Sequence, residues 1–103
     1  MLYTIIRAPS ATLDLDNILL YITEQLKNPT AAASLLVEYE KKQSILCESP
    51  RFYALSKNER LGRKNYRCFI FGNYIAYYNI DDTNQTVNIL RIFYQKQNYG
   101  ETL

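Results

Sequence analysis

The sequence has 103 residues, of which 48% are hydrophobic and 21% are charged, with a formal net charge of +2. This length supports one compact core and the composition is that of a folded protein, so we expect residues 1–103 to form a single domain. No apolar run approaches the ~20 residues of a membrane-spanning helix. The first residues also lack the apolar core of a secretory signal, so we expect a cytoplasmic protein with no membrane partner.

The first half of the chain predicts a strand followed by two helices. Residues 2–7 are rich in β-branched and aromatic side chains, which indicates a short strand at or near the edge of a sheet. Ser10 or Thr12 is expected to cap a helix that ends before Pro29. Thr30 is expected to cap a second helix, which runs to about residue 47. The short link between them predicts an antiparallel helical hairpin.

The second half predicts an antiparallel meander. Residues 67–71, 74–80 and 86–94 are rich in β-forming residues and are separated by turn sequences. The fold class is therefore α+β, in the order β-α-α-β-β-β, with a helical hairpin packed on one face of a small, mainly antiparallel sheet. Both alternating faces of the middle strand are apolar or aromatic, so the second face is a candidate partner surface unless the C-terminal tail covers it.

Positive charge is concentrated in residues 51–67, where six basic residues and one acid give a net charge of +5. Such a segment is either an ordinary solvated connection or a surface for an anionic partner. Arg63, Lys64 and Arg67 have the best claim to contact an anion, because three neighbouring cations repel one another without one.

The C-terminal run of residues 91–99 mixes basic residues with tyrosines. Strand alternation predicts that Arg91 and Phe93 share one face of the sheet, while Ile92 and Tyr94 point to the other. Such residues suit stacking on bases and pairing with phosphates, and they also suit a protein interface. Arg91 is expected either to meet an acid of a partner or to form an ion pair with Asp14 or Glu38 within the chain.

Most enzyme classes are excluded by missing motifs. The sequence has no GxSxG, GxxxxGK[ST], GxGxxG or HExxH pattern, and it has no histidine. The two cysteines, Cys47 and Cys68, lack a CxxC spacing, so we expect no metal site, no disulfide and no cofactor.

The order of the predicted elements, together with a series of short motifs, resembles the RelE/ParE superfamily of toxins from bacterial type II toxin–antitoxin systems. The C-terminal run is more similar to the ParE pattern than to the RelE pattern. The motifs that carry the resemblance are Asp14-Leu15-Asp16-Asn17-Ile18, Asn28-Pro29-Thr30-Ala31-Ala32, Ser49-Pro50, Arg60-Leu61-Gly62-Arg63-Lys64, Tyr66-Arg67, Gly72-Asn73-Tyr74, Tyr78-Asn79-Ile80-Asp81 and Val87-Asn88-Ile89-Leu90-Arg91-Ile92.

The resemblance implies a growth-inhibiting toxin that a cognate antitoxin protein wraps and neutralises, with operator DNA contacted only through that antitoxin. ParE-type members inhibit DNA gyrase, whereas RelE-type members are metal-independent endoribonucleases that cut messenger RNA on the translating ribosome. Arg67 keeps one basic position of the nuclease pattern, but Phe69, Ile75 and Gln95 occupy others. We therefore favour the gyrase branch and leave open whether the protein is an enzyme. A non-toxic protein-interaction module is the remaining alternative.

These arguments select two overlapping sets of residues. If the protein is a nuclease, the expected catalytic residues are Arg67, Lys64, Lys96 and Tyr99. The residues expected to bind the target or the antitoxin are Arg60, Arg63, Lys64, Arg67, Arg91, Tyr94, Lys96 and Tyr99.

Overall fold

The computed structural model describes residues 2–96 of the chain. Four strands and four helical segments follow one another in it. In chain order they are β1 (Thr4–Arg7), α1 (Pro9–Leu20), η1 (Tyr21–Gln25), α2 (Pro29–Glu48), α3 (Glu59–Arg63), β2 (Arg67–Phe71), β3 (Tyr74–Asp81) and β4 (Thr86–Tyr94).

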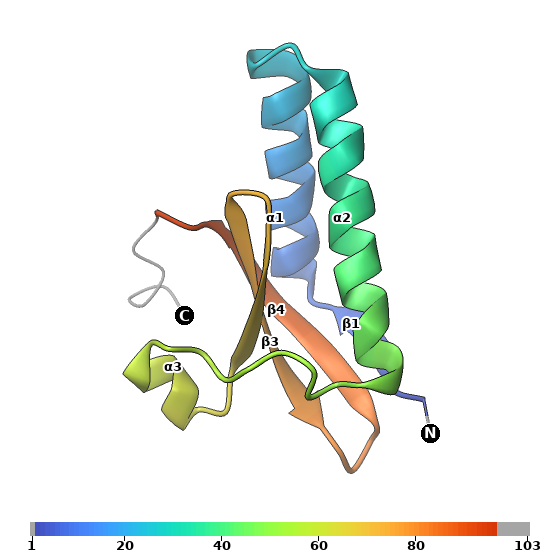
Figure 1. Cartoon of the computed structure of the whole chain (residues 1–103), viewed down its shortest axis with the longest axis vertical. Coiled ribbons are helices and arrows are strands. Elements are labelled where there is room, and N and C mark those ends of the chain that lie inside the picture. Colours follow the sequence, from blue (N-terminus) through green and yellow to red (C-terminus); the bar gives the residue numbers. More distant parts are fainter. Residues whose placement is uncertain (1, 97–103) are drawn as a thin grey trace.

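The strands form one sheet in the order β1-β4-β3-β2, in which β1 runs parallel to β4 and the other pairs are antiparallel. Figure 1 shows α1 and α2 side by side as a hairpin, with α3 apart from them near the other end of the sheet. The predicted α+β fold class, with a helical hairpin on a mainly antiparallel sheet, is confirmed, and so is the edge position of the first strand.

The first helix begins without a side-chain cap. Its N-cap residue is Ala8, and Pro9 occupies the first turn, so the prediction that Ser10 or Thr12 caps this helix is wrong. Proline suits this place because its fixed φ is already helical and its missing N–H would have no intrahelical partner there. The helix continues into the π-helical turn η1, which ends before Lys27 takes a positive φ of 52°.

The cap of the second helix lies two residues earlier than predicted. The side-chain oxygen of Asn28 accepts a hydrogen bond from the backbone N–H of Ala31 at 3.1 Å, and Pro29 occupies the first turn. Asn28 is therefore the cap, and the prediction for Thr30 is wrong. The Asn-Pro pair follows the end of η1 after two residues and starts the next helix, which produces the predicted hairpin.

The main core lies between the hairpin and the sheet and is rich in aromatic rings. Tyr39 of α2 packs on Phe71 with ring centroids 5.0 Å apart, and Tyr53 packs on Phe69 at 5.2 Å. Tyr78 is fully buried in the same cluster and donates a hydrogen bond from its hydroxyl group to Pro50 O at 3.1 Å. Burial raises the pKa of the Tyr78 hydroxyl, so this group stays a neutral donor.

A second apolar cluster lies on the opposite face of the sheet. Leu61 of α3 is fully buried there and packs with Ile75, Tyr77 and Phe93. The sequence predicted that both faces of the middle strand are apolar, and it offered only the C-terminal tail as a cover. Within residues 2–96, part of this cover comes from the basic connection, which folds into the short helix α3.

Strand β4 carries an extra residue in its pairing with β3. Tyr78 pairs with Ile89 and Tyr77 pairs with Arg91, so Leu90 stands between two consecutive pairs as a β-bulge. Ile89 and Ile92 lie in the main core, whereas Phe93 lies in the second cluster. After the bulge, even-numbered residues point to the main core and odd-numbered residues point to the second cluster. Arg91 and Phe93 therefore share one face of the sheet, as expected.

Candidate functional site

Arg91 and Asp14 form an ion pair where β4 extends past the end of β1. The last residue pair of β1 and β4 is Arg7 with Ile89, so the edge of β4 beyond it has no strand neighbour in the sheet. Asp14 of α1 fills this place. Its Oδ2 accepts hydrogen bonds from Arg91 Nε at 2.8 Å and from the backbone N–H of Ile92 at 3.0 Å, and its Oδ1 accepts one from Arg91 Nη2 at 3.1 Å.

This arrangement fixes the Arg91 side chain from two directions. The side chain of Asp14 is 16% exposed and that of Arg91 is 30% exposed. The guanidinium carbon also lies 4.8 Å from the centre of the Phe93 ring, within range of a cation–π contact. The hydrogen bonds to Asp14 raise the pKa of Arg91 further above its ordinary value. Of the alternatives left open for Arg91, the structure contains the internal pair with Asp14.

A cavity of about 200 Å³ opens beside this ion pair. Asp14, Arg91 and Tyr94 line it, together with Tyr74, whose ring centroid lies 5.7 Å from that of Tyr94. Arg91 and Tyr94, two of the residues selected from the sequence, are therefore brought together. The cavity offers a charged donor and aromatic edges at the end of β4.

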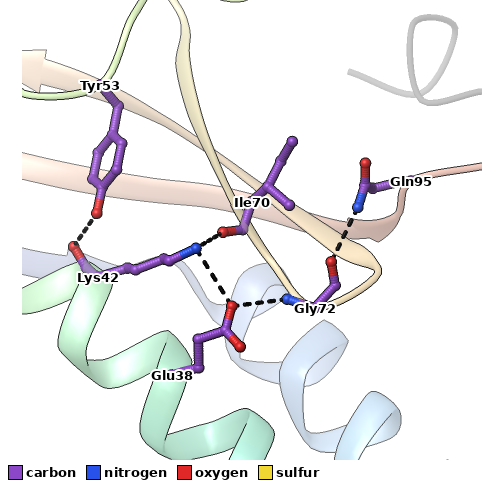
Figure 2. A network of polar contacts seen from close by, with 6 residues as sticks. All are labelled: Glu38, Lys42, Tyr53, Ile70, Gly72 and Gln95. Atoms are coloured by element: carbon purple, nitrogen blue, oxygen red, sulfur yellow. Dashed lines mark hydrogen bonds and ion pairs between the residues drawn. The ribbon is translucent and has the colours of Figure 1, made fainter.

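A polar network fixes the turn between β2 and β3 to α2 (Figure 2). Glu38 Oε2 accepts a hydrogen bond from the backbone N–H of Gly72 at 2.9 Å and forms an ion pair with Lys42 Nζ at 3.4 Å. Lys42 also donates to Ile70 O, and Gln95 Nε2 donates to Gly72 O at 3.1 Å. Gln95, where the nuclease pattern has an arginine, thus connects the end of β4 to this turn.

Glycine is favoured at position 72 of this turn for two reasons. Its φ is +57°, in the left-handed region, and a Cβ placed on it would come within 2.7 Å of Leu35 Cδ1. The turn therefore lies close against α2, and a side chain at this position would strain the backbone and displace the end of the Leu35 side chain.

The cations of the basic connection have separate partners within the chain. Arg63 forms an ion pair with Glu59 on α3, and Lys64 Nζ lies 5.8 Å from the centre of the Tyr66 ring. Arg67 Nη1 donates a hydrogen bond to Tyr53 O at 2.7 Å. Mutual repulsion among Arg63, Lys64 and Arg67 therefore does not by itself require an external anion.

The residues selected from the sequence form two groups. Arg60, Arg63 and Lys64 lie in or directly after α3, and Arg67 begins β2. Arg91 and Tyr94 lie at the end of β4 with the exposed Lys96 just beyond them. Tyr99 lies outside the described residues. Of the other nuclease positions, Phe69 and Ile75 are both buried in apolar clusters on opposite faces of the sheet.

Arg51 was counted in the sequence only as one charge of the basic connection, but it forms a surface ion pair with two hydrogen bonds. Its Nη2 and Nη1 donate to the two carboxylate oxygens of Asp82 at 2.5 and 3.2 Å, and Tyr3 OH donates to the same carboxylate at 2.7 Å. The hydrogen bond from Arg51 lowers the pKa of Asp82 below its ordinary value. Residues 31 positions apart are joined, and no local pattern indicates this pairing.

Residues 2–96 have neither a metal-binding cluster nor a membrane-spanning helix. That part of the chain contains no group of acidic and cysteine side chains arranged to hold a metal ion. None of its helices combines the length and the apolar character needed to cross a membrane.

Comparison with known proteins assigns the family. A family model described as the ParE toxin of the type II toxin–antitoxin system parDE matches residues 5–99, and the chain belongs to this family within the RelE/ParE superfamily. No curated protein matches the sequence.

Two solved structures have a similar fold. One is a chromosomal ParDE toxin–antitoxin system from P. aeruginosa, with a TM-score of 0.68 and 18% identity, covering 88% of this chain and 94% of that one. The other is the toxin–antitoxin complex RelBE2 from Mycobacterium tuberculosis, with a TM-score of 0.60 and 26% identity, covering 91% of this chain and 99% of that one. The family resemblance inferred from the sequence motifs is therefore confirmed.

Proposed function

We propose that the protein arrests growth by inhibiting DNA gyrase and that a cognate antitoxin neutralises it. The observation that carries the choice of target is the burial of Phe69 and Ile75, at positions where ribosome-dependent nucleases of the superfamily have cations. Cleavage of a phosphodiester bond needs cations directed at the scissile phosphate, and loss of one such group typically lowers the rate ~10²-fold or more. Membership of the ParE toxin family supports the same branch.

For contact with target or antitoxin we propose the end of β4 and the basic connection. Arg91 and Tyr94 line the cavity at the end of β4, with Lys96 following, and the exposed cations of α3 form a second patch. An antitoxin segment with acidic and apolar residues suits both regions, because charge steers the encounter and apolar burial then holds the complex. The toxin–antitoxin complexes among the similar structures support a protein partner of this kind.

One observation favours the alternative of messenger-RNA cleavage. Arg67 occupies a retained basic position of the nuclease pattern and lines a polar cavity. In that case Arg67 would stabilise the phosphate, Lys64 or Lys96 would assist, and Tyr99 would stack on a base.

Expression alone and with the antitoxin tests the proposal. Induced expression of the chain alone should arrest growth, and co-expression of the small adjacent gene should relieve the arrest. Purified protein should inhibit supercoiling by gyrase, and Lys96→Ala should weaken inhibition while Lys41→Ala, an exposed lysine on α2, leaves it unchanged. Normal growth with abundant protein would instead indicate a non-toxic interaction module. Codon-phased cuts on translating ribosomes that disappear in Arg67→Ala would assign the protein to the nuclease branch.

A further inference from the structure

A polar cavity of about 360 Å³ lies at the end of the sheet opposite the Asp14–Arg91 pair, and none of the proposed gyrase contacts at the end of β4 uses it. Arg51, Asn65, Arg67 and Asp82 supply its polar wall, and Leu55 and Ile80 supply the apolar part. Two arginines and one aspartate give this lining a net charge of +1. A cavity with this balance favours a single anionic group over a cation.

The donors of the cavity are held in place before any ligand arrives. Arg51 is fixed by its two hydrogen bonds to Asp82, and Arg67 is fixed by the bond from Nη1 to Tyr53 O. Of the five N–H donors of a guanidinium group, Arg67 uses one in this bond, and it makes no ion pair within residues 2–96. Donors that are already positioned lose little conformational entropy on binding.

Backbone hydrogen bonds also hold the chain around the cavity against β2 and α3. Leu55 pairs with Arg67 as an isolated bridge at the edge of β2, and the N–H of Ser56 donates to Tyr66 O at 2.8 Å. Asn65 has a φ of 63° and donates its backbone N–H to Gly62 O at 2.9 Å, which fixes its backbone directly after α3. The wall is therefore a structured element of the fold.

A second, mainly apolar hollow of about 460 Å³ shares Arg51 with the polar cavity. Tyr3, Pro50 and Phe52 line it, and Phe52 is 64% exposed although its ring packs edge-on against Tyr53 with centroids 5.0 Å apart. Exposed aromatic rings beside an arginine suit stacking of a flat heterocycle. A cavity that favours an anion, next to an exposed aromatic surface, is complementary to the phosphate and the base of a nucleotide.

We propose that this pair of cavities binds a nucleotide, with the phosphate at Arg67 and Asn65 and the base against Phe52. Arg67 supplies charge-assisted hydrogen bonds to the phosphate oxygens, and the Asn65 amide supplies a neutral donor. The phosphate belongs either to a free nucleoside monophosphate or to a single strand of nucleic acid, and both present the same chemistry to the site.

Titration of the full chain with AMP, inorganic phosphate, adenosine and a tri-adenylate without terminal phosphates tests the proposal by NMR shifts of the backbone amides. AMP should shift amides around Asn65 and Phe52 saturably, and Arg67→Gln should weaken its binding by about tenfold or more. Lys41→Gln, an exposed lysine of α2 outside both cavities, should leave binding unchanged. Phe52→Ala should weaken AMP and leave inorganic phosphate unaffected. Stronger binding of the tri-adenylate than of AMP would identify a nucleic-acid strand as the source of the phosphate.

A second variant keeps the test decisive if Arg67→Gln does not fold. Asn65→Gly removes the amide and suits a left-handed backbone, so it should fold and should weaken AMP severalfold. Absence of saturable binding of any phosphate ligand below about 10 mM would overturn the proposal. The same holds if Arg67→Gln folds and binds AMP as the unmodified chain does. Binding of an acidic, aromatic peptide at these residues without binding of AMP would also overturn it and assign the cavities to a protein partner.

Discussion

Replacement of Asp14 by alanine removes the contact that joins α1 to the end of β4. The change deletes all three hydrogen bonds that the carboxylate accepts, two from Arg91 and one from the backbone of Ile92. It leaves a partly buried guanidinium group without its counter-charge and a strand-edge N–H without its acceptor. Removal of one partner of a buried polar pair costs more than the pair contributes, because the remaining group stays desolvated.

The expected cost follows from the exposure of the two groups. A fully buried pair broken on one side loses about 3–5 kcal/mol, but the 30% exposure of Arg91 lets water replace part of the contact. We therefore expect Asp14→Ala to lower the free energy of unfolding by about 2–3 kcal/mol. For a domain of this size, that corresponds to a fall in Tm of about 10–20 °C. Asp14→Asn keeps one acceptor oxygen and should lose about half as much.

Urea denaturation followed by circular dichroism measures this loss. Asp16→Ala is the matched control, because Asp16 lies on the same helix, is exposed, and should change stability by less than about 0.5 kcal/mol. The double variant Asp14→Ala with Arg91→Ala should destabilise less than the sum of the two single changes. If Asp14→Ala costs no more than Asp16→Ala, or if the double variant is strictly additive, the Asp14–Arg91 pair does not stabilise the fold as argued.

Two further predictions concern other parts of the fold. Gly72→Ala should lower the free energy of unfolding by about 1–3 kcal/mol and so lower the urea midpoint, because the φ of residue 72 is +57° and the new Cβ would clash with Leu35. An unchanged midpoint would show that the turn moves freely away from α2. The pKa of Asp82 is lowered from 3.8 in the folded protein, so folding favours the carboxylate form. The contribution of this carboxylate to stability is present above pH 3.8 and is lost as the pH falls through the lower folded pKa. NMR titration of the Asp82 carboxyl checks this, and Arg51→Gln should return the pKa toward 3.8.

Local sequence patterns were sufficient for most of the fold. The period of apolar residues identified both long helices and the three C-terminal strands, because each element buries a continuous face. Helix α3 was missed because it has only five residues and its single buried anchor, Leu61, gives no period. The cap predictions failed for another reason: in both helices a proline fixes the first turn, and the residue before that proline becomes the N-cap.

The candidate site was only partly predictable, because its contacts join distant parts of the chain. The sequence correctly placed Arg91 and Phe93 on one face and offered Asp14 as a possible partner of Arg91. It did not indicate the Arg51–Asp82 pair, since neither residue stands in a pattern that selects the other. Such long-range pairings depend on how the basic connection packs against the turn after β3, and no local propensity encodes this packing.

The β-bulge at Leu90 divides β4 into two parts that obey opposite rules of alternation. Before the bulge, odd-numbered residues face the helices, and after it the even-numbered Ile92 does so. Deletion of Leu90 would keep Arg91 opposite Tyr77 and Ile92 opposite Ala76, so both would stay on their present faces in a regular strand. Loss of the bulge with Leu90 retained would instead pair Arg91 with Ala76, which would drive the Arg91 charge under the hairpin and push Ile92 out to the opposite face. An ungapped alignment with a relative that lacks the bulge would therefore equate the core residue of that relative with Arg91.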